Sequence, residues 1–215
     1  MKKKISFAVL LLSFSSLFAQ NVSYQANTIL DNTVSKYNLL SNFSFDFSLK
    51  IENGANKSQE MKGVLIVKKE KYFLTFEDQI IANDGVMLWN FNKSTNEAEL
   101  FDAELDEEAF SMYNPIKMLN NWKKEYNAKY IGKKELKKKM NYIVELTPKK
   151  RLQFDKIGVY IDEISNYFSL LKLYAIDGTI ITYSITKFTP NAKIEDAMFS
   201  FNKKDYPNVQ VIDMR

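Results

Sequence analysis

The sequence has 215 residues, of which 46% are hydrophobic and 14% aromatic, a composition typical of a folded globular protein. It contains no cysteine and no histidine. This excludes disulfides, a cysteine-linked lipid anchor, Ser-His-Asp and Cys-His catalysis, and zinc sites built on these residues. The net charge is +4, but three of the 30 basic residues are Lys2, Lys3 and Lys4. The other 27 basic residues nearly balance the 26 acidic residues. This balance gives no support to nucleic-acid binding.

Residues 1–19 have the pattern of a secretory signal peptide. The basic start is followed by an apolar run from Ile5 to Phe18 and then by Ala19, a small residue suited to cleavage before Gln20. The run is shorter than the roughly 20 apolar residues that a membrane span needs. We therefore expect a soluble, exported protein. Residues 20–215 are expected to form a single domain, because they show no internal repeat, low-complexity segment or boundary.

A helix is expected first, over Ser23 to Leu40, because apolar residues recur there at helical spacing. The period changes to two over Asn42 to Ile51, where Phe43, Phe45 and Phe47 alternate with polar residues. This alternation predicts a strand with one apolar and one polar face.

Short β-rich runs separated by tight breaks make up most of the remaining chain. Asp84-Gly85 and Asp177-Gly178 are the strongest hairpin signals, because glycine supplies the positive φ that such turns need. Many antiparallel strands with short turns imply a barrel or a strongly curved sheet. The other expected strands are Gln59–Lys69, Lys71–Phe76, Gln79–Ala82, Val86–Phe91, Asn96–Phe101, Glu125–Ile131, Met140–Leu146, Lys156–Ile161, Phe168–Ala175, Ile180–Phe188, Phe199–Phe201 and Val209–Ile212.

Two helices are expected to interrupt the sheet. The first follows Asp102, where apolar residues at positions 105, 109, 112 and 113 have helical spacing and acidic residues fill the first half. Asn114-Pro115 then supplies the cap and first turn of a second, short helix that carries Met118, Leu119 and Trp122 on one face. This insertion suits a cover over a cavity, although an ordinary helix packed on a sheet fits the same pattern.

Two basic runs stand out, one with five lysines between Lys133 and Lys139 and one from Lys149 to Arg151. Lysines at turns and sheet edges commonly block edge pairing; the alternative is a patch that meets anionic headgroups or an acidic partner. The aromatic sheet expected over Gly63–Phe91 contains no group suited to nucleophilic or metal chemistry, and a pair of carboxylates for acid–base catalysis needs a proximity that the sequence does not show. We therefore expect no enzyme activity, catalytic residue, metal or cofactor.

In their order and spacing, these segments resemble the LolA family of periplasmic lipoprotein carriers over nearly the whole of residues 20–215. The most telling part is Asn83-Asp84-Gly85 with Leu88-Trp89 close behind, which is similar to the family's "DG-x-x-LW". No single motif is specific by itself. The other similar segments are Leu40–Phe47, Gly63–Lys69 followed by Tyr72-Phe73, Pro115–Leu119, Glu145–Pro148, Phe199–Phe201 and Val209–Val211.

The resemblance implies a mainly β fold with α-helices: an incomplete, unclosed antiparallel β-barrel of about eleven strands with a helical lid over an apolar cavity. It implies a monomeric periplasmic carrier that takes triacylated lipoproteins from an inner-membrane ABC transporter and passes them to an outer-membrane acceptor. No nucleic-acid partner is expected. Acyl chains need such shielding, because each buried methylene is worth about 0.8 kcal/mol. The candidate residues lining the apolar cavity are Phe43, Phe45, Phe47, Phe73, Leu88, Trp89, Met118, Leu119 and Trp122.

One position departs from the family pattern. The family has an Arg-Pro pair after the second strand, whose arginine holds the lid, and this sequence has Lys69 and Glu70 there. Lysine is a point donor on a flexible stem and lacks the planar fork of arginine. We therefore expect Lys69 to form a weaker lid latch.

Two other functions fit the sequence. One is a periplasmic protein that binds another lipid or glycolipid on the same fold, and the other is a structural or signalling sheet domain with a filled core. A packed interior would favour the second of these. The molecules that co-purify with the protein would separate the lipid classes.

The expected signal peptide, residues 1–19, generates the first testable prediction. The processed protein is expected in the soluble periplasmic fraction, without an acyl chain, because the leader ends without a cysteine to modify. Cell fractionation and intact-mass measurement would check this. Retention in either membrane after a high-salt wash would contradict it.

Overall fold

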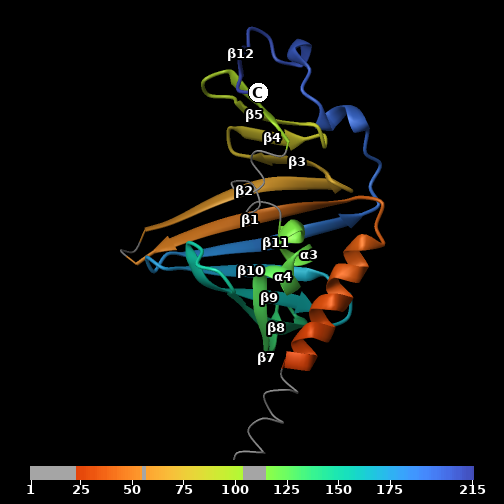
Figure 1. Ribbon diagram of the computed structural model, residues 1–215, viewed down its shortest axis with the longest axis vertical. Helices are drawn as coiled ribbons and strands as arrows, with labels where there is room; N and C mark the ends of the chain where they lie inside the picture. Colours follow the sequence, from red (N-terminus) through yellow and green to blue (C-terminus); the bar gives the residue numbers. More distant parts are fainter. Residues whose placement is uncertain (1–22, 55–56, 104–114) are drawn as a thin grey trace, which may run out of the picture.

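The protein is built on one large, strongly curled sheet that does not close on itself. The structure is a computed structural model that describes residues 23–54, 57–103 and 115–215. The strand order is β12-β6-β5-β4-β3-β2-β1-β11-β10-β9-β8-β7, so β12 and β7 form separate edges; Figure 1 shows them at opposite ends of the sheet, β12 at the top and β7 at the bottom. The strands are β1 Phe43–Asn53, β2 Lys57–Lys68, β3 Lys71–Phe76, β4 Gln79–Asn83, β5 Met87–Asn92, β6 Glu97–Asp102, β7 Tyr126–Leu136, β8 Lys139–Pro148, β9 Phe154–Asp162, β10 Phe168–Ala175, β11 Ile180–Pro190 and β12 Gln210–Asp213.

The predicted architecture, an unclosed and mainly antiparallel β-barrel with helices, is confirmed, with twelve strands in place of about eleven. Every pairing is antiparallel except that of β12, which runs parallel to β6. The first predicted helix is also confirmed, over residues 23–38. It buries Ala26, Leu30 and Tyr37 in the main core.

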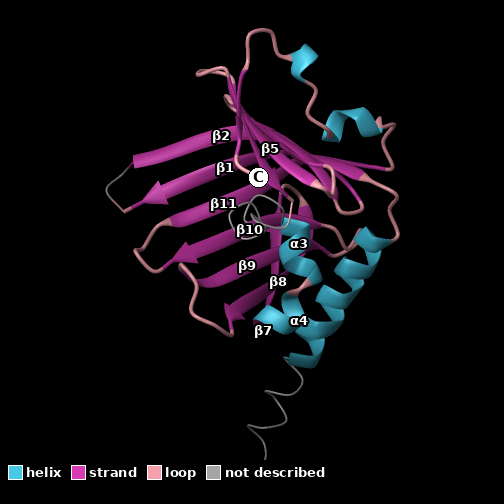
Figure 2. Cartoon of the chain, turned by 45° about the horizontal axis from the view of Figure 1, so that its top comes forward, coloured by secondary structure: helices cyan, strands magenta, loops and turns pink. Residues whose placement is uncertain are grey.

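Two short helices interrupt the sheet between β6 and β7, α3 over Pro115–Asn120 and α4 over Trp122–Glu125. The predicted helix start at Pro115 is therefore confirmed. Together with the helix of residues 23–38, these helices lie on the same face of the sheet (Figure 2), which we call the concave face. The other predicted helix, over positions 105–113, falls on residues 104–114, which lie outside the described part of the chain.

The prediction of a strand over Phe199–Phe201 is wrong. The segment contains a 3-10 turn, η1 Asp196–Phe199, followed by irregular chain and by a second turn, η2 Lys203–Asp205. The reason is that its backbone groups bond locally or to a side chain in place of a neighbouring strand: the Ser200 amide donates to the Ala197 carbonyl at 3.3 Å, and the Trp89 Nε1 donates to the Phe199 carbonyl at 3.1 Å.

The sheet has an apolar core on each face. On the concave face, alternate residues of β1, including Phe43, Phe45 and Phe47, pack with the helices. On the outer face of β3 to β6, a smaller cluster around Trp89 and Phe91 is covered by the segment that leads to β12. Alternation along each strand sends neighbouring side chains to opposite faces, which creates the two cores.

Both predicted glycine hairpins are confirmed. Gly85 has φ 93° and Gly178 has φ 86°, values that favour glycine. In the first turn, the Asp84 carboxylate accepts hydrogen bonds from the Val86 and Met87 amides at 3.0 and 2.9 Å. Burial opposes its charged form, but the bonds from Met87 and Val86 outweigh this effect and lower the pKa of Asp84.

Gly63 of β2 permits a close approach of three neighbouring strands. It pairs with Phe47 of β1 and Phe76 of β3. A β-carbon at this position would come within 2.5 Å of the Phe47 ring and would also clash with the Thr75 carbonyl oxygen. The absence of a side chain at Gly63 therefore lets the Phe47 ring lie across β2.

We expect Gly63→Ala to lower the free energy of unfolding by about 1–3 kcal/mol, because the methyl group displaces the Phe47 ring and the β3 backbone. Urea denaturation would measure this. Gly54→Ala is the matched control, because no described atom beyond the glycine and its chain neighbours lies within 4 Å of the added methyl group. Equal stability of the two variants would show that Phe47 moves aside without cost.

Candidate functional site

The concave face brings together seven of the nine residues predicted to line a cavity. Six are at most 5% exposed and belong to one contiguous cluster, and Met118 is partly buried against it. They come from the sheet strands β1 and β5 and from α3 and α4. The seven residues are Phe43, Phe45, Phe47, Leu88, Met118, Leu119 and Trp122.

Aromatic rings dominate this face, and several of them were not predicted as site residues. Phe45 lies 5.2 Å from Phe168 and 5.4 Å from Phe188, measured between ring centroids. Tyr37 lies 5.1 Å from Tyr167. The sequence places these rings on a helix and on two distant strands, so only the fold shows that they meet. The missed residues include Tyr37, Tyr167, Phe168, Tyr183 and Phe188.

The cover formed by α3 and α4 is attached to the sheet mainly by apolar side chains. Ile116, Leu119 and Trp122 are buried against the core. Polar links lie at its α4 end, where Lys123 pairs with Asp31 of the N-terminal helix at 2.8 Å and the Lys149 ammonium donates to the Lys123 carbonyl at 2.6 Å. The ion pair is exposed, and such pairs contribute about 0–1 kcal/mol. Hydrophobic contact therefore supplies most of the attachment.

Two hydroxyl groups in this apolar interior have no hydrogen-bond partner among the described residues, those of Tyr37 and Tyr183. Burial raises the pKa of both tyrosines well above the ordinary value. The Phe168 backbone near the Tyr37 hydroxyl partly opposes this increase in the pKa of Tyr37, but the two groups are not aligned as a hydrogen bond. The Tyr183 ring stacks on Phe47 at 4.5 Å. The interior thus offers two unused donors beside an aromatic surface.

Phe73 and Trp89 are not brought together with the other seven residues. They lie on the outer face, in the cluster covered by the chain that leads to β12. Trp89 is 1% exposed and its indole is bonded to the Phe199 carbonyl. Their predicted contact with a ligand would require displacement of this chain.

Lys69 is exposed in the turn between β2 and β3, with φ 56°. Its neighbours Lys68 and Lys71 pair with Asp196 of η1, so they hold the outer cover rather than the helical one. No hydrogen bond joins the Lys69 side chain to α3 or α4 within the described residues. The latch stays a prediction, because residues 104–114 of the insertion are outside this range.

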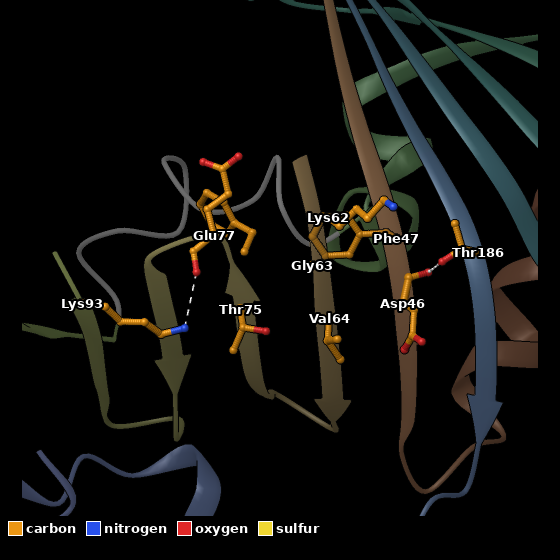
Figure 3. Close-up of a pocket in the computed structure, with 10 residues that line it drawn as sticks. Asp46, Phe47, Lys62, Gly63, Val64, Thr75, Glu77, Lys93 and Thr186 are labelled. Atoms are coloured by element: carbon orange, nitrogen blue, oxygen red, sulfur yellow. Dashed lines mark hydrogen bonds between the residues drawn. The ribbon is translucent and has the colours of Figure 1, made fainter. Parts of the chain in front are cut away.

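A pocket of about 550 Å³ opens beside Gly63 and Phe47, where the sheet bends (Figure 3). Its lining is mixed: Asp46, Lys62 and Lys93 contribute charges, and the Lys93 ammonium donates to the Glu77 carbonyl at 3.4 Å. This polar lining does not match an acyl chain. Within the described residues, no group of three acidic side chains is placed to hold a metal ion, and no helix is long and apolar enough to cross a membrane.

Comparison with known proteins defines the fold class more firmly than the family. A crystal structure of an uncharacterized conserved protein from Thermus thermophilus superposes with a TM-score of 0.61, over 88% of this chain and 99% of that chain, at 11% identity. The two proteins share a fold. The structural neighbours also include a LolA superfamily protein from Nitrosomonas europaea, with a TM-score of 0.45 and 12% identity over 82% of this chain and 97% of that chain.

Sequence comparison adds one relative. No family model matches the chain. The uncharacterized protein MJ0687 of Methanocaldococcus jannaschii is 29% identical over 136 residues, which are 62% of this chain and 38% of that protein. The similarity therefore spans well under half of the relative's length.

The unpartnered hydroxyl of Tyr183 generates a testable prediction. We expect Tyr183→Phe to raise the free energy of unfolding by about 1 kcal/mol, because it removes a buried donor that has no partner. Tyr142→Phe is the contrasting control, because the Tyr142 hydroxyl donates to Glu163 at 3.2 Å, and its loss is expected to destabilise by about 0.5–1.5 kcal/mol. Thermal and urea unfolding would measure both; destabilisation by Tyr183→Phe would indicate a bound water in the interior.

Proposed function

We propose that the protein is an exported carrier that holds the acyl chains of lipoproteins against its concave face. The observation that carries the proposal is the contiguous aromatic face covered by α3 and α4. Among the described residues these helices pair with no strand, and the bond from the Lys149 amide to the Glu125 carbonyl at 2.8 Å lies at the junction of α4 with β7, so the cover can lift while the sheet stays paired. The sequence resemblance and the leader support the same function.

The free energy that holds the cover on the sheet is comparable to the free energy gained by burying an acyl chain. Burial of three side chains, Ile116, Leu119 and Trp122, contributes roughly 5–8 kcal/mol to holding the cover. An acyl chain gains about 0.8 kcal/mol for each buried methylene. About ten methylenes would thus offset the cover, and a lipoprotein with several long chains would exceed it.

The two unpartnered tyrosine hydroxyls fit a lipid better than a pure hydrocarbon. Phenol groups donate hydrogen bonds, and the ester carbonyls that join acyl chains to glycerol accept them. Tyr37 and Tyr183 could therefore bond the polar end of a chain whose methylenes replace the core contacts. Each bond would remove the penalty of about 1–3 kcal/mol for an unsatisfied buried donor.

The wider pathway is part of the proposal. A triacylated lipoprotein would be taken from an inner-membrane ABC transporter, carried across the periplasm by the monomeric protein, and passed to an outer-membrane acceptor. Lys69 would help hold the empty lid as a weak latch.

A second candidate has its own support. Phe45 and Leu119 are at most 1% exposed, and the described interior is packed with rings. This packing favours a filled-core module that functions through its surface. A third possibility, a carrier of another lipid or glycolipid, uses the same concave face.

Tryptophan fluorescence can separate these functions, because the two tryptophans lie on opposite faces. In a Trp89→Phe variant, emission comes from Trp122 on the cover. We expect a saturable change of that emission with a triacylated peptide and none with the unacylated peptide, because lifting the cover moves Trp122 out of the core. A single-chain ester and its alkane analogue would test the contribution of the tyrosines.

The matched control is Trp122→Phe, in which Trp89 emission is expected to stay constant. A lack of saturable change with every acylated compound would favour the filled-core module. An equal response to a diacyl phospholipid or glycolipid would favour a carrier of another lipid.

A further inference from the structure

The turn between β7 and β8 has an unusual composition for its backbone. Lys137 and Lys138 form a two-residue turn with φ values of 49° and 65°. Positive φ at both positions is typical of a type I′ turn, for which Asn-Gly is strongly preferred. A β-carbon is unfavourable in this conformation. The chain therefore places two long cations where the local backbone disfavours them.

This turn is the tip of a cationic surface. Five lysines lie between positions 133 and 139, against three carboxylates, Glu135, Asp162 and Glu163. Lys133 pairs with Glu163, and Lys139 lies 3.4 Å from Asp162. The side chains of the other three lysines form no ion pair with any described residue. They are Lys134, Lys137 and Lys138.

Exposed apolar side chains accompany these charges. Ile164 is 94% exposed in the turn between β9 and β10. The turn is well defined, because the Asp162 carboxylate accepts hydrogen bonds from the Ile164 and Ser165 amides at 3.0 and 2.8 Å. The Glu163 amide donates to the Met140 carbonyl at 3.0 Å, which joins this turn to the lysine hairpin, and Met140 is itself 43% exposed.

Edge protection explains part of this surface. Lys133 and Lys134 lie on β7, an edge strand, where lysine blocks pairing with another chain. Edge protection does not explain Lys137 and Lys138, which lie in the turn after β7. It also does not explain why Ile164 is exposed to water in the turn between β9 and β10. Cations beside exposed apolar side chains are the combination that binds an anionic bilayer surface.

We propose that the two turns, residues 137–138 and 163–166, dock the protein on membranes that contain anionic lipids. The lysines attract the headgroups, and Ile164 with Met140 enters the boundary between headgroups and acyl chains. An acidic protein partner would use the charges but would have less need of the isoleucine. The proposal does not depend on cargo binding, because neither turn belongs to the concave face.

Flotation with phosphatidylglycerol-containing vesicles, compared with pure phosphatidylcholine vesicles, tests the proposal. Each lysine near an anionic surface contributes a factor of about five, so Lys137→Asn/Lys138→Gly should weaken binding about 25-fold. The same substitutions create the preferred turn and should raise the melting temperature, so a loss of binding cannot come from misfolding. Lys150→Gln/Arg151→Gln, in the exposed loop between β8 and β9, removes the same charge and should leave binding unchanged.

Ile164→Ser separates a bilayer from an acidic protein. It should weaken vesicle binding but leave binding to soluble polyglutamate unchanged. Equal binding to both kinds of vesicle, no vesicle binding, or equal losses in the two double variants would overturn the proposal. Vesicle binding that is insensitive to Ile164→Ser, with equal affinity for polyglutamate, would assign the surface to an acidic protein.

Discussion

An aromatic face on a sheet that does not close is the constraint from which the rest of the structure follows. Phe43, Phe45 and Phe47 point to the same side of β1 because a strand alternates its side chains. With β12 and β7 unpaired to each other, no strand can cover these rings. Helices must remove them from water, and the three described helices all lie on that face.

The two faces of the sheet are covered in physically different ways. The outer cover is held by directional bonds, from the Trp89 indole and from the two lysines that pair with Asp196, and by the β12 ladder. The inner cover is held by apolar contact with a few polar links around Lys123 and Lys149. Apolar contact is non-directional, so contact with another apolar surface can replace it. The inner cover is therefore the one that a lipid could displace.

A packed interior is compatible with a binding role if the cover can open to admit a ligand. A ligand shifts the equilibrium only by its differential affinity for the open state. Ring contacts such as the stack of Phe47 on Tyr183 would then be exchanged for acyl methylenes. The unpartnered Tyr183 hydroxyl is a cost of this packing that a ligand with an acceptor group would remove.

Local features were predictable from the sequence, because their causes lie within a few residues. The alternation of β1, the turns at Gly85 and Gly178, and the helix start at Pro115 are of this kind. The many short strands with tight turns also predicted a barrel or a strongly curved sheet, and the resemblance implied that the sheet stays open. The same periodicity placed Phe43, Phe45 and Phe47 on one face of a strand.

The assignment of residues to faces and the fate of the last segment depended on tertiary structure. Leu88 and Trp89 are both apolar and alternation sends them to opposite faces, but only the tertiary structure shows which of the two faces the helices. The run around Phe199 alternates like a strand, yet its carbonyl bonds an indole 110 residues earlier in the chain. Tyr37 meets Phe168 in the same way, across a large sequence separation. Such contacts depend on register and long-range packing, which local periodicity does not encode.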